Sequence, residues 1–323
     1  MKTFGFALWF MILAPLVGYG GETYLAVGPG GQRMSAVDGL DWGNHVAWGE
    51  PKHDQNDLNV AAFFKGAAYV GGGYSIARLT ATRDGQTWSE GALPKGSPIF
   101  GLEVLNDVLY AITLRGQVYK TADGQTWTLV AAAEMPTKTH WIRAAASGNG
   151  IIIGSGDYGP ALAFDPKTEK ITVTQMAGQK DKNAGLKRVA FGNGVFVVGG
   201  QDGLLAVTRD GITWQNNHEH AERGDIKSVV WTGKMFLAST DKMGTWTSED
   251  GLVWQHEQRQ LPRMMVRAGS WIYGWSWPPF KLQRSQDGLA WEPVPNEQEY
   301  HVKHVAFGQL AGHGAPPPIP AGK

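Results

Sequence analysis

"VTRDGITWQN", residues 207–216, places an Asp-Gly pair between two short runs of β-forming residues and follows it closely with a tryptophan. Gly211 can supply the left-handed backbone conformation of a tight turn, and the Asp210 carboxylate can accept hydrogen bonds from the N–H groups of that turn. Trp214 is large enough to wedge between neighbouring sheets. All three residues serve the architecture, so the stretch predicts a β-hairpin rather than a reactive site.

The same motif returns along almost the whole chain. Its copies are "VDGLDW", "RDGQTW", "ADGQTW", "RDGITW", "EDGLVW" and "QDGLAW", whose aspartates are Asp38, Asp84, Asp123, Asp210, Asp250 and Asp287. The long gap before Asp210 holds "FDPKTEKITV", a degraded copy at Asp165 without the glycine and the tryptophan. A period of roughly 40 residues is typical of a β-propeller blade, so seven copies predict seven blades.

One repeat shows the four strands of a blade. Residues 186–194, 195–203, 204–210 and 212–217 form four short runs, each bounded by Gly, Asn or Asp as hairpin strands are. The same order is expected in the other repeats. The sequence therefore predicts an all-β fold, a seven-bladed β-propeller of four-stranded antiparallel blades over residues 21–310.

The two ends of the propeller are expected to complete each other. The first repeat lacks its first strand, because "TYLAVGPGG" at residues 23–31 already resembles a second strand. "HVKHVAFGQ" at residues 301–309 matches a first strand and has no second strand after it. Pairing between the N-terminal and C-terminal repeats would close the ring and remove the exposed sheet edges.

The repeated motif resembles the Asp-box of the sialidase-like, or BNR-repeat, propellers and of the photosystem II assembly factor propellers, although each copy is one residue shorter between Asp and Trp. The resemblance covers nearly all of residues 21–310. It implies that the six box aspartates lie in turns between the third and fourth strands, on the rim away from the ligand face. Their role is then structural.

Composition limits the classes of function. Residues 1–20 place Lys2 before an apolar run from Phe4 to Val17, which predicts a signal peptide, export to the periplasm or the outside, and no stable membrane span after cleavage. The chain has no cysteine, and its 29 Lys plus Arg balance 29 Asp plus Glu, so disulfides and a global field for nucleic acid are excluded. The Pro-rich tail, residues 311–323, is expected to be disordered.

A column of cations is expected at the start of the innermost strands, where propellers generally bind ligands. Alignment of the repeats puts Lys187, Arg143, Lys227, Arg263 and Lys303 at one position, with Asn59 and Phe100 in the other two repeats. Five cations in one structural column predict a basic channel mouth that attracts an anion. The alternative is that each cation pairs with a nearby acid, such as Asp225 before Lys227.

Histidines gather in the connections that lead into these strands. His140, Trp141 and Arg143 would lie together, with Trp141 as a stacking surface and His140 or His304 as a general base. The spacing of His218 and His220 could hold a divalent metal, although exposed loop histidines explain it better. No other cofactor is indicated.

An aromatic connection stands out at residues 271–284, "WIYGWSWPPFKLQR". Trp277 and its neighbours could form a platform for a carbohydrate, or could simply pack between blades. Tyr158 lies in another connection of the same kind and could act as a phenolic acid or base.

These residues support three functions. The favoured one is recognition of an anionic ligand, a glycan above all, whose catalytic form is a polysaccharide lyase: Arg143 and the cation column neutralise a uronate carboxylate, and His140, His304 or Tyr158 removes a proton. The alternative is a non-enzymatic scaffold that binds a protein partner, as the resemblance to the assembly factors implies. A sialidase-like hydrolase ranks third, because the Arg-Ile-Pro sequence of sialidases is absent.

Overall fold

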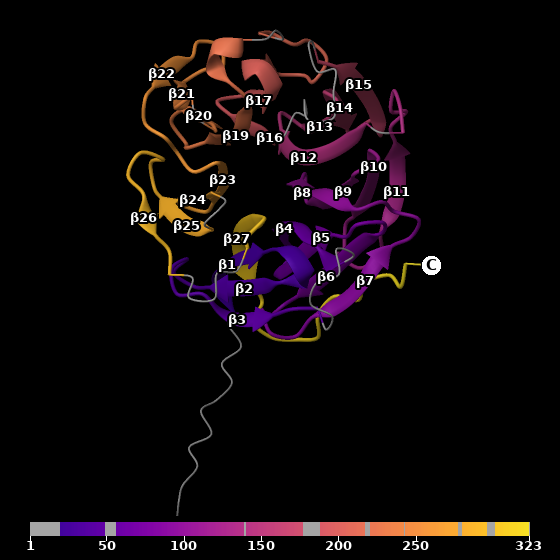
Figure 1. Ribbon diagram of the computed structural model, residues 1–323. Helices are drawn as coiled ribbons and strands as arrows, with labels where there is room; N and C mark the ends of the chain where they lie inside the picture. The colour runs from indigo at the N-terminus through magenta and orange to yellow at the C-terminus, as the bar shows by residue number, and fades with distance from the viewer. Residues whose placement is uncertain are drawn as a thin grey trace, which may run out of the picture.

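Seven antiparallel sheets form a ring in the computed structural model (Figure 1). It describes residues 20–48, 56–138, 140–176, 188–216, 220–241, 243–276, 280–295 and 301–322. Apart from three 3₁₀ turns, η1 (Pro29–Gly31), η3 (Gln201–Gly203) and η4 (Ala221–Arg223), the regular elements in these ranges are strands. The predicted all-β, seven-bladed propeller is confirmed.

Blades are numbered here in ring order, and their strands run from the innermost to the outermost. Blade 1 holds β27 (His304–Leu310), β1 (Gly21–Val27), β2 (Arg33–Ala36) and β3 (Gly43–Val46); blade 2 holds β4 (Leu58–Phe64), β5 (Ala67–Gly72), β6 (Ala77–Thr82) and β7 (Ser89–Leu93). Blade 3 holds β8 (Ile99–Leu105), β9 (Val108–Thr113), β10 (Gln117–Thr121) and β11 (Thr128–Ala132); blade 4 holds β12 (Trp141–Gly148), β13 (Ile151–Asp157), β14 (Pro160–Asp165) and β15 (Lys170–Gln175).

The remaining blades repeat the pattern, with one irregularity. Blade 5 holds β16 (Arg188–Gly192), β17 (Val195–Gly199) and β18 (Leu205–Thr208); blade 6 holds β19 (Ile226–Trp231), β20 (Phe236–Thr240), β21 (Thr245–Ser248) and β22 (Gln255–Glu257); blade 7 holds β23 (Met264–Ala268), β24 (Trp271–Ser276), β25 (Lys281–Ser285) and β26 (Glu292–Pro293). The fourth strand expected over residues 212–217 of blade 5 is reduced, among the described residues, to a single bridge between Val207 and Gln215.

Blade 1 closes the ring as the sequence predicts. β27 pairs antiparallel with β1 over seven residue pairs, from Gly21 opposite Leu310 to Val27 opposite His304. Val305 and Leu310 of β27 are buried against the neighbouring strands. The innermost strand of the first blade therefore comes from the C-terminal end of the propeller.

The Asp-Gly turns have one hydrogen-bonding pattern. In blade 2, the Asp84 carboxylate accepts hydrogen bonds from the N–H groups of Gln86 and Thr87 at 2.8 and 2.7 Å, while the Thr82 hydroxyl donates to Asp84 and accepts from Gly85 N–H. The same pair of backbone donors meets the other five box aspartates. These donors hold the pKa of Asp123 and Asp287 below its ordinary range, because they stabilise the ionised carboxylate.

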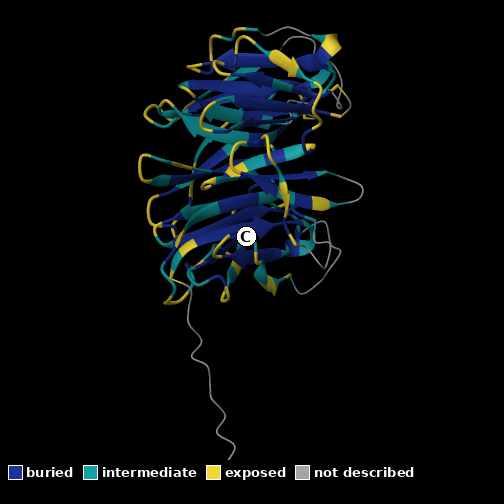
Figure 2. Cartoon of the chain, turned by 90° about the vertical axis from the view of Figure 1, so that its left-hand side faces the viewer, coloured by how far each residue is buried: buried dark blue, intermediate teal, exposed yellow. Residues whose placement is uncertain are grey.

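Each turn also fastens its blade to the blade before it. Gly124 has φ +76° and lies directly against the Tyr69 hydroxyl of blade 2, so a side chain at position 124 would collide with the tyrosine. Trp127 packs edge-on against the same tyrosine, with ring centroids 6.3 Å apart. The core thus lies between the blades, and Figure 2 shows buried strands with exposure concentrated in their connections.

The C-terminal tail differs from its prediction. Instead of a disordered segment, residues 311–322 lie along blade 2, where the C-terminus comes to lie near β7 (Figure 1). Gly312 N–H donates to the Arg83 carbonyl, Ala92 N–H donates to the Pro320 carbonyl, and Ile319 packs against the core between blades 2 and 3. The Pro-rich composition indicated no helix or strand, but these contacts give the tail a fixed place.

The predicted signal peptide, residues 1–20, lies outside the described residues except for Gly20. Within the part of the chain that the structure describes, no helix is long and apolar enough to cross a membrane.

Candidate functional site

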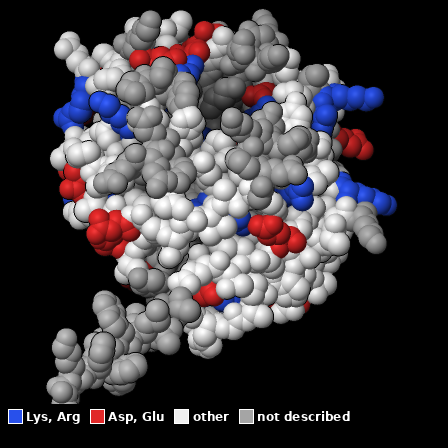
Figure 3. All heavy atoms as spheres, turned by 60° about the horizontal axis from the view of Figure 1, so that its bottom comes forward, with Lys and Arg blue, Asp and Glu red and all other residues white. Residues whose placement is uncertain are grey.

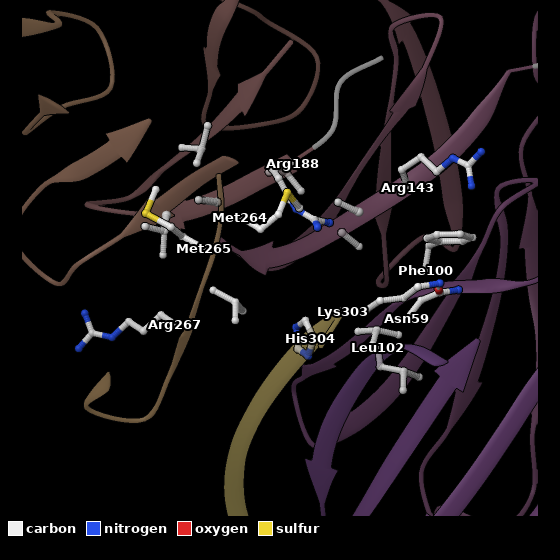
Figure 4. Close-up of a pocket in the computed structure, with 18 of the residues that line it drawn as sticks. Asn59, Phe100, Leu102, Arg143, Arg188, Met264, Met265, Arg267, Lys303 and His304 are labelled. Atoms are coloured by element: carbon white, nitrogen blue, oxygen red, sulfur yellow. The ribbon is translucent and has the colours of Figure 1, made fainter. Parts of the chain in front are cut away.

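The seven innermost strands surround a central channel of about 590 Å³ (Figure 4). Its walls are mostly apolar, with Leu102, Val189, Val229, Met264 and Met265 among the residues that line it. Polar groups are fewer: Asn59, Glu103, Arg143, Arg188, Arg267, Lys303 and His304. A cavity with apolar walls and a few polar groups is the usual form of a small-molecule site.

Two of the predicted column cations lie in this channel, and each has a carboxylate partner. Arg143 Nε lies 2.7 Å from an oxygen of the buried Asp157. Lys303 Nζ lies 2.6 Å from an Asp57 oxygen and donates a second hydrogen bond to Asn59 Oδ1 at 3.3 Å. Lys187, a third member of the column, lies outside the described residues.

The other two column cations share an acid. Lys227 Nζ lies 3.1 Å from Asp225 and 3.2 Å from Asp241, and Arg263 Nε lies 3.1 Å from the same Asp241. Every described member of the column is thus ion-paired, so the geometry agrees with paired charges rather than with a free basic ring. On the face shown in Figure 3, acidic and basic side chains are interspersed among uncharged ones.

Blade 4 brings together four of the predicted site residues. The Arg143 guanidinium lies over the rings of Trp141 and Phe100, 4.9 and 5.1 Å from their centroids. The His140 ring lies 5.4 Å from the Tyr158 ring, and its Nδ1 forms a 2.6 Å hydrogen bond with Thr137 Oγ1. The predicted cluster of His140, Trp141 and Arg143 therefore lies beside the channel, and Tyr158 lies next to it.

His304 does not join that cluster. It lies on β27 and lines the channel, where its Nδ1 accepts a hydrogen bond from Ala61 N–H at 3.3 Å. Burial, together with the positive charge of Arg188, lowers the pKa of His304 to about 4. With Nδ1 occupied and a low pKa, this imidazole is a weak proton acceptor.

Arg188 and Glu103 are among the polar channel residues that the sequence analysis did not predict. Arg188, next to the predicted Lys187, lines the channel, and desolvation lowers its pKa to about 10. Glu103 of β8 accepts a 2.8 Å hydrogen bond from Ser147 Oγ of β12, and desolvation raises its pKa to about 7.

The predicted metal site receives no structural support within the described residues. His218 lies outside them, and His220 pairs with Glu222 through a 3.1 Å contact. No group of three or more His, Asp or Glu side chains suited to a metal ion occurs among the residues that the structure describes.

A second cavity, called here the mouth pocket, adjoins the channel between blades 7 and 1. It has a volume of about 430 Å³, and its apolar lining consists of Pro29, Met264, Trp275, Phe280 and Val302. Met264, Trp275 and Val302 also line the channel, so the two cavities are continuous. Trp275 packs in the core between blades while it lines the pocket, and Trp277 lies outside the described residues.

Comparison with known proteins finds similar propellers among solved structures. No protein-family model and no curated protein matches the chain. Among solved structures, YCF48 from Cyanidioschyzon merolae matches 77% of this chain and 87% of its own, with 15% identity and a TM-score of 0.56. YCF48 bound to D1 peptide matches 77% and 85%, with 15% identity and a TM-score of 0.58.

A computationally designed protein, Ika8, matches 91% of this chain and 92% of its own, with 12% identity and a TM-score of 0.53. At such identities the likeness establishes the fold alone. The predicted resemblance to the photosystem II assembly factor propellers is confirmed at the level of the fold, and the resemblance to the sialidase-like propellers is not.

Proposed function

We propose that the protein is a binding scaffold that holds an apolar segment of a partner protein at the mouth of its channel. The mouth pocket carries this proposal, because it is an open apolar hollow at the channel mouth, the end at which propellers generally bind ligands. Interfaces draw much of their affinity from a few apolar or aromatic side chains that enter such hollows. The YCF48 propeller with a bound D1 peptide supports the general mode.

The charges around the mouth pocket favour a protein partner over a polyanion. Arg263 and Lys303 lie at its edge, and both are paired with acids. A uronate-rich glycan would have to compete with Asp241 and Asp57 for these cations. An apolar side chain would not, since it needs only the walls formed by Met264, Trp275 and Phe280.

Peptide binding to the purified protein tests the proposal. Peptides selected from a random display library would be labelled, and their affinities measured by fluorescence anisotropy for the wild type, Phe280→Ala and Val253→Ala. Val253 is a matched control, because it is 69% exposed and lies in the Asp-Gly turn of blade 6. Phe280→Ala should weaken binding by about tenfold or more, as for an interface hot spot, and Val253→Ala should leave it unchanged.

Two results would overturn the scaffold. One is the failure of selection to yield any peptide of measurable affinity, and the other is equal affinity for the wild type and Phe280→Ala.

An enzymatic alternative rests on the blade 4 cluster. Arg143 over Trp141, with His140 and Tyr158 beside them, offers a cation, a stacking surface and two proton-transfer groups for a lyase acting on uronate residues of a glycan. The ion pair with Asp157 makes this function the weaker proposal. Incubation with uronate-containing polysaccharides, with and without divalent metal, should give no rise in ultraviolet absorbance. A rise that Arg143→Ala abolishes would establish the lyase instead.

Export is also part of the proposal, on the sequence of residues 1–20 alone. N-terminal sequencing of the protein recovered outside the cytoplasm would test it, with a new N-terminus near Gly20 as the expected result.

A further inference from the structure

Arg188 is set apart from the other cations of the channel. Arg143 and Lys303 have carboxylate partners at 2.7 and 2.6 Å. Arg267 is exposed and donates its Nε to the Gly269 carbonyl at 3.3 Å. Arg188 lines the cavity from β16, is half-buried, and makes no ion pair or side-chain hydrogen bond with any residue that the structure describes. A half-buried guanidinium without a partner has its N–H donors available to an anion that enters the channel.

The charge of the channel favours such an anion. Glu103 is the one carboxylate among the residues that line the described cavity. Its pKa of about 7 leaves it largely protonated below neutral pH, and it is already held by Ser147 of the adjacent blade. Within the described residues, no carboxylate forms an ion pair with Arg188.

His304 supplies a second donor on the other side of the same cavity. Its Nδ1 is the acceptor of the Ala61 N–H hydrogen bond, so in the neutral imidazole the proton lies on Nε2. Arg188 and His304 line the same cavity, and the positive charge of Arg188 helps to lower the pKa of His304. Figure 4 shows both side chains in the channel, one from β16 and the other from β27.

The walls define the rest of the ligand. Leu102, Val189, Val229, Met264 and Met265 surround these two polar groups, and a volume of about 590 Å³ is within the usual range for a small-molecule site. A planar guanidinium binds a carboxylate through two parallel hydrogen bonds, a geometry that specifies this anion well.

We propose that the channel is a binding site for a small amphiphilic carboxylate, whose carboxylate lies between Arg188 and His304 and whose apolar body lies against the valine, leucine and methionine walls. This site adjoins the mouth pocket and shares Met264 with it, but the recognition of a carboxylate by Arg188 does not depend on the binding of a partner segment there.

Titration calorimetry of the purified protein with octanoate, octanamide and acetate tests the site. Octanoate should bind with a stoichiometry of one. Octanamide keeps the apolar chain without the charge, and acetate keeps the charge without the chain. Each should bind at least tenfold more weakly than octanoate if both parts of the ligand are recognised. This comparison uses the wild type alone and so does not depend on the folding of a variant.

Two matched variants identify the cation. Arg188→Met keeps the bulk of the side chain and should reduce octanoate affinity by at least tenfold. Arg209→Met removes an exposed guanidinium in the Asp-Gly turn of blade 5, which does not line the channel, and should change the affinity by less than about twofold. Circular dichroism would confirm that both variants are folded.

Three outcomes would overturn the site: no binding of octanoate, equal binding of octanoate and octanamide, or equal octanoate affinity for the wild type and folded Arg188→Met. None of them bears on peptide binding, which Phe280→Ala tests separately.

Discussion

The two ends of the propeller differ in how much they vary from blade to blade. At the end that carries the Asp-Gly turns, six blades place the same carboxylate under the same two backbone N–H groups. At the channel mouth, the column position holds Asn59, Phe100, Arg143, Lys227, Arg263 or Lys303. Uniform turns indicate a shared structural task, whereas the variable end carries side chains suited to binding.

This difference predicts that substitutions at the two ends of the propeller have different effects. Substitutions in the turns should lower the stability and leave ligand binding intact. Substitutions in the channel should change binding and its pH dependence while the fold persists.

The largest effect is expected at Gly124. A side chain there would overlap the Tyr69 hydroxyl and would also hold a positive φ, so Gly124→Ala should lower the free energy of unfolding by about 3 kcal/mol. Gly150 has a similar φ of +80° but nothing within 4 Å of its added Cβ, so Gly150→Ala should cost only about 1 kcal/mol. Urea denaturation would measure both. Equal losses would mean that the contact between blades does not add to the cost of the turn.

Titration of the channel should give the next effect. His304, with a pKa of about 4 in the folded protein and about 6.5 unfolded, binds more protons when unfolded, so its contribution makes stability rise with pH between these values. Glu103, with a pKa of about 7 folded and about 4.5 unfolded, binds more protons when folded, so its contribution makes stability fall as pH rises between those values.

The two contributions oppose each other between about pH 4.5 and 6.5, and variants should separate them. In Glu103→Gln only His304 remains, so the free energy of unfolding should rise with pH in this window. In His304→Gln only Glu103 remains, so the free energy of unfolding should fall with pH. Each slope should be on the order of 1 kcal/mol per pH unit. Denaturation at three pH values would check the slopes. Slopes that match the wild type in both variants would show that neither group is perturbed by the channel.

The smallest effect is expected from one turn carboxylate. Asp123→Ala removes the acceptor of the Gln125 and Thr126 N–H groups and should lower the free energy of unfolding by about 1 kcal/mol, while Asp123→Asn keeps an acceptor oxygen and should lose less. Thermal unfolding would rank the two variants. Neither should alter octanoate or peptide affinity, and a change in either would contradict the division between the two ends.

The sequence was sufficient to predict the fold, because the motif that forms each turn is short and recurs in almost every blade. An Asp, a Gly and a Trp within a few residues determine each turn, and six copies determine the number of repeats once Asp165 is included. Closure of the ring by residues 301–309 could be predicted for the same reason, since that segment matches the strand that the first repeat lacks.

The channel was harder to predict, because its contacts join distant parts of the chain. Lys303 pairs with Asp57, and the two residues come together only through ring closure. The buried Arg33 binds Glu90 of the next blade and lies between Trp48 and Trp88, which no local pattern indicates. An alignment of the repeats finds positions that hold similar residues, and Arg188 is not at such a position. Its distinguishing property is that no described carboxylate pairs with it, which only the three-dimensional structure shows.

The pairing of β27 with β1 also sets an order of events in folding. A chain made from its N-terminus has β1, β2 and β3 long before residues 304–310 exist, so blade 1 is begun first and completed last. Until then β1 presents an unpaired inner edge, a surface prone to association with other strands. Contacts between segments so distant in sequence also close slowly. Pairing of β27 with β1 therefore both closes the ring and completes the channel wall, because His304 lies on that strand and Lys303 directly precedes it.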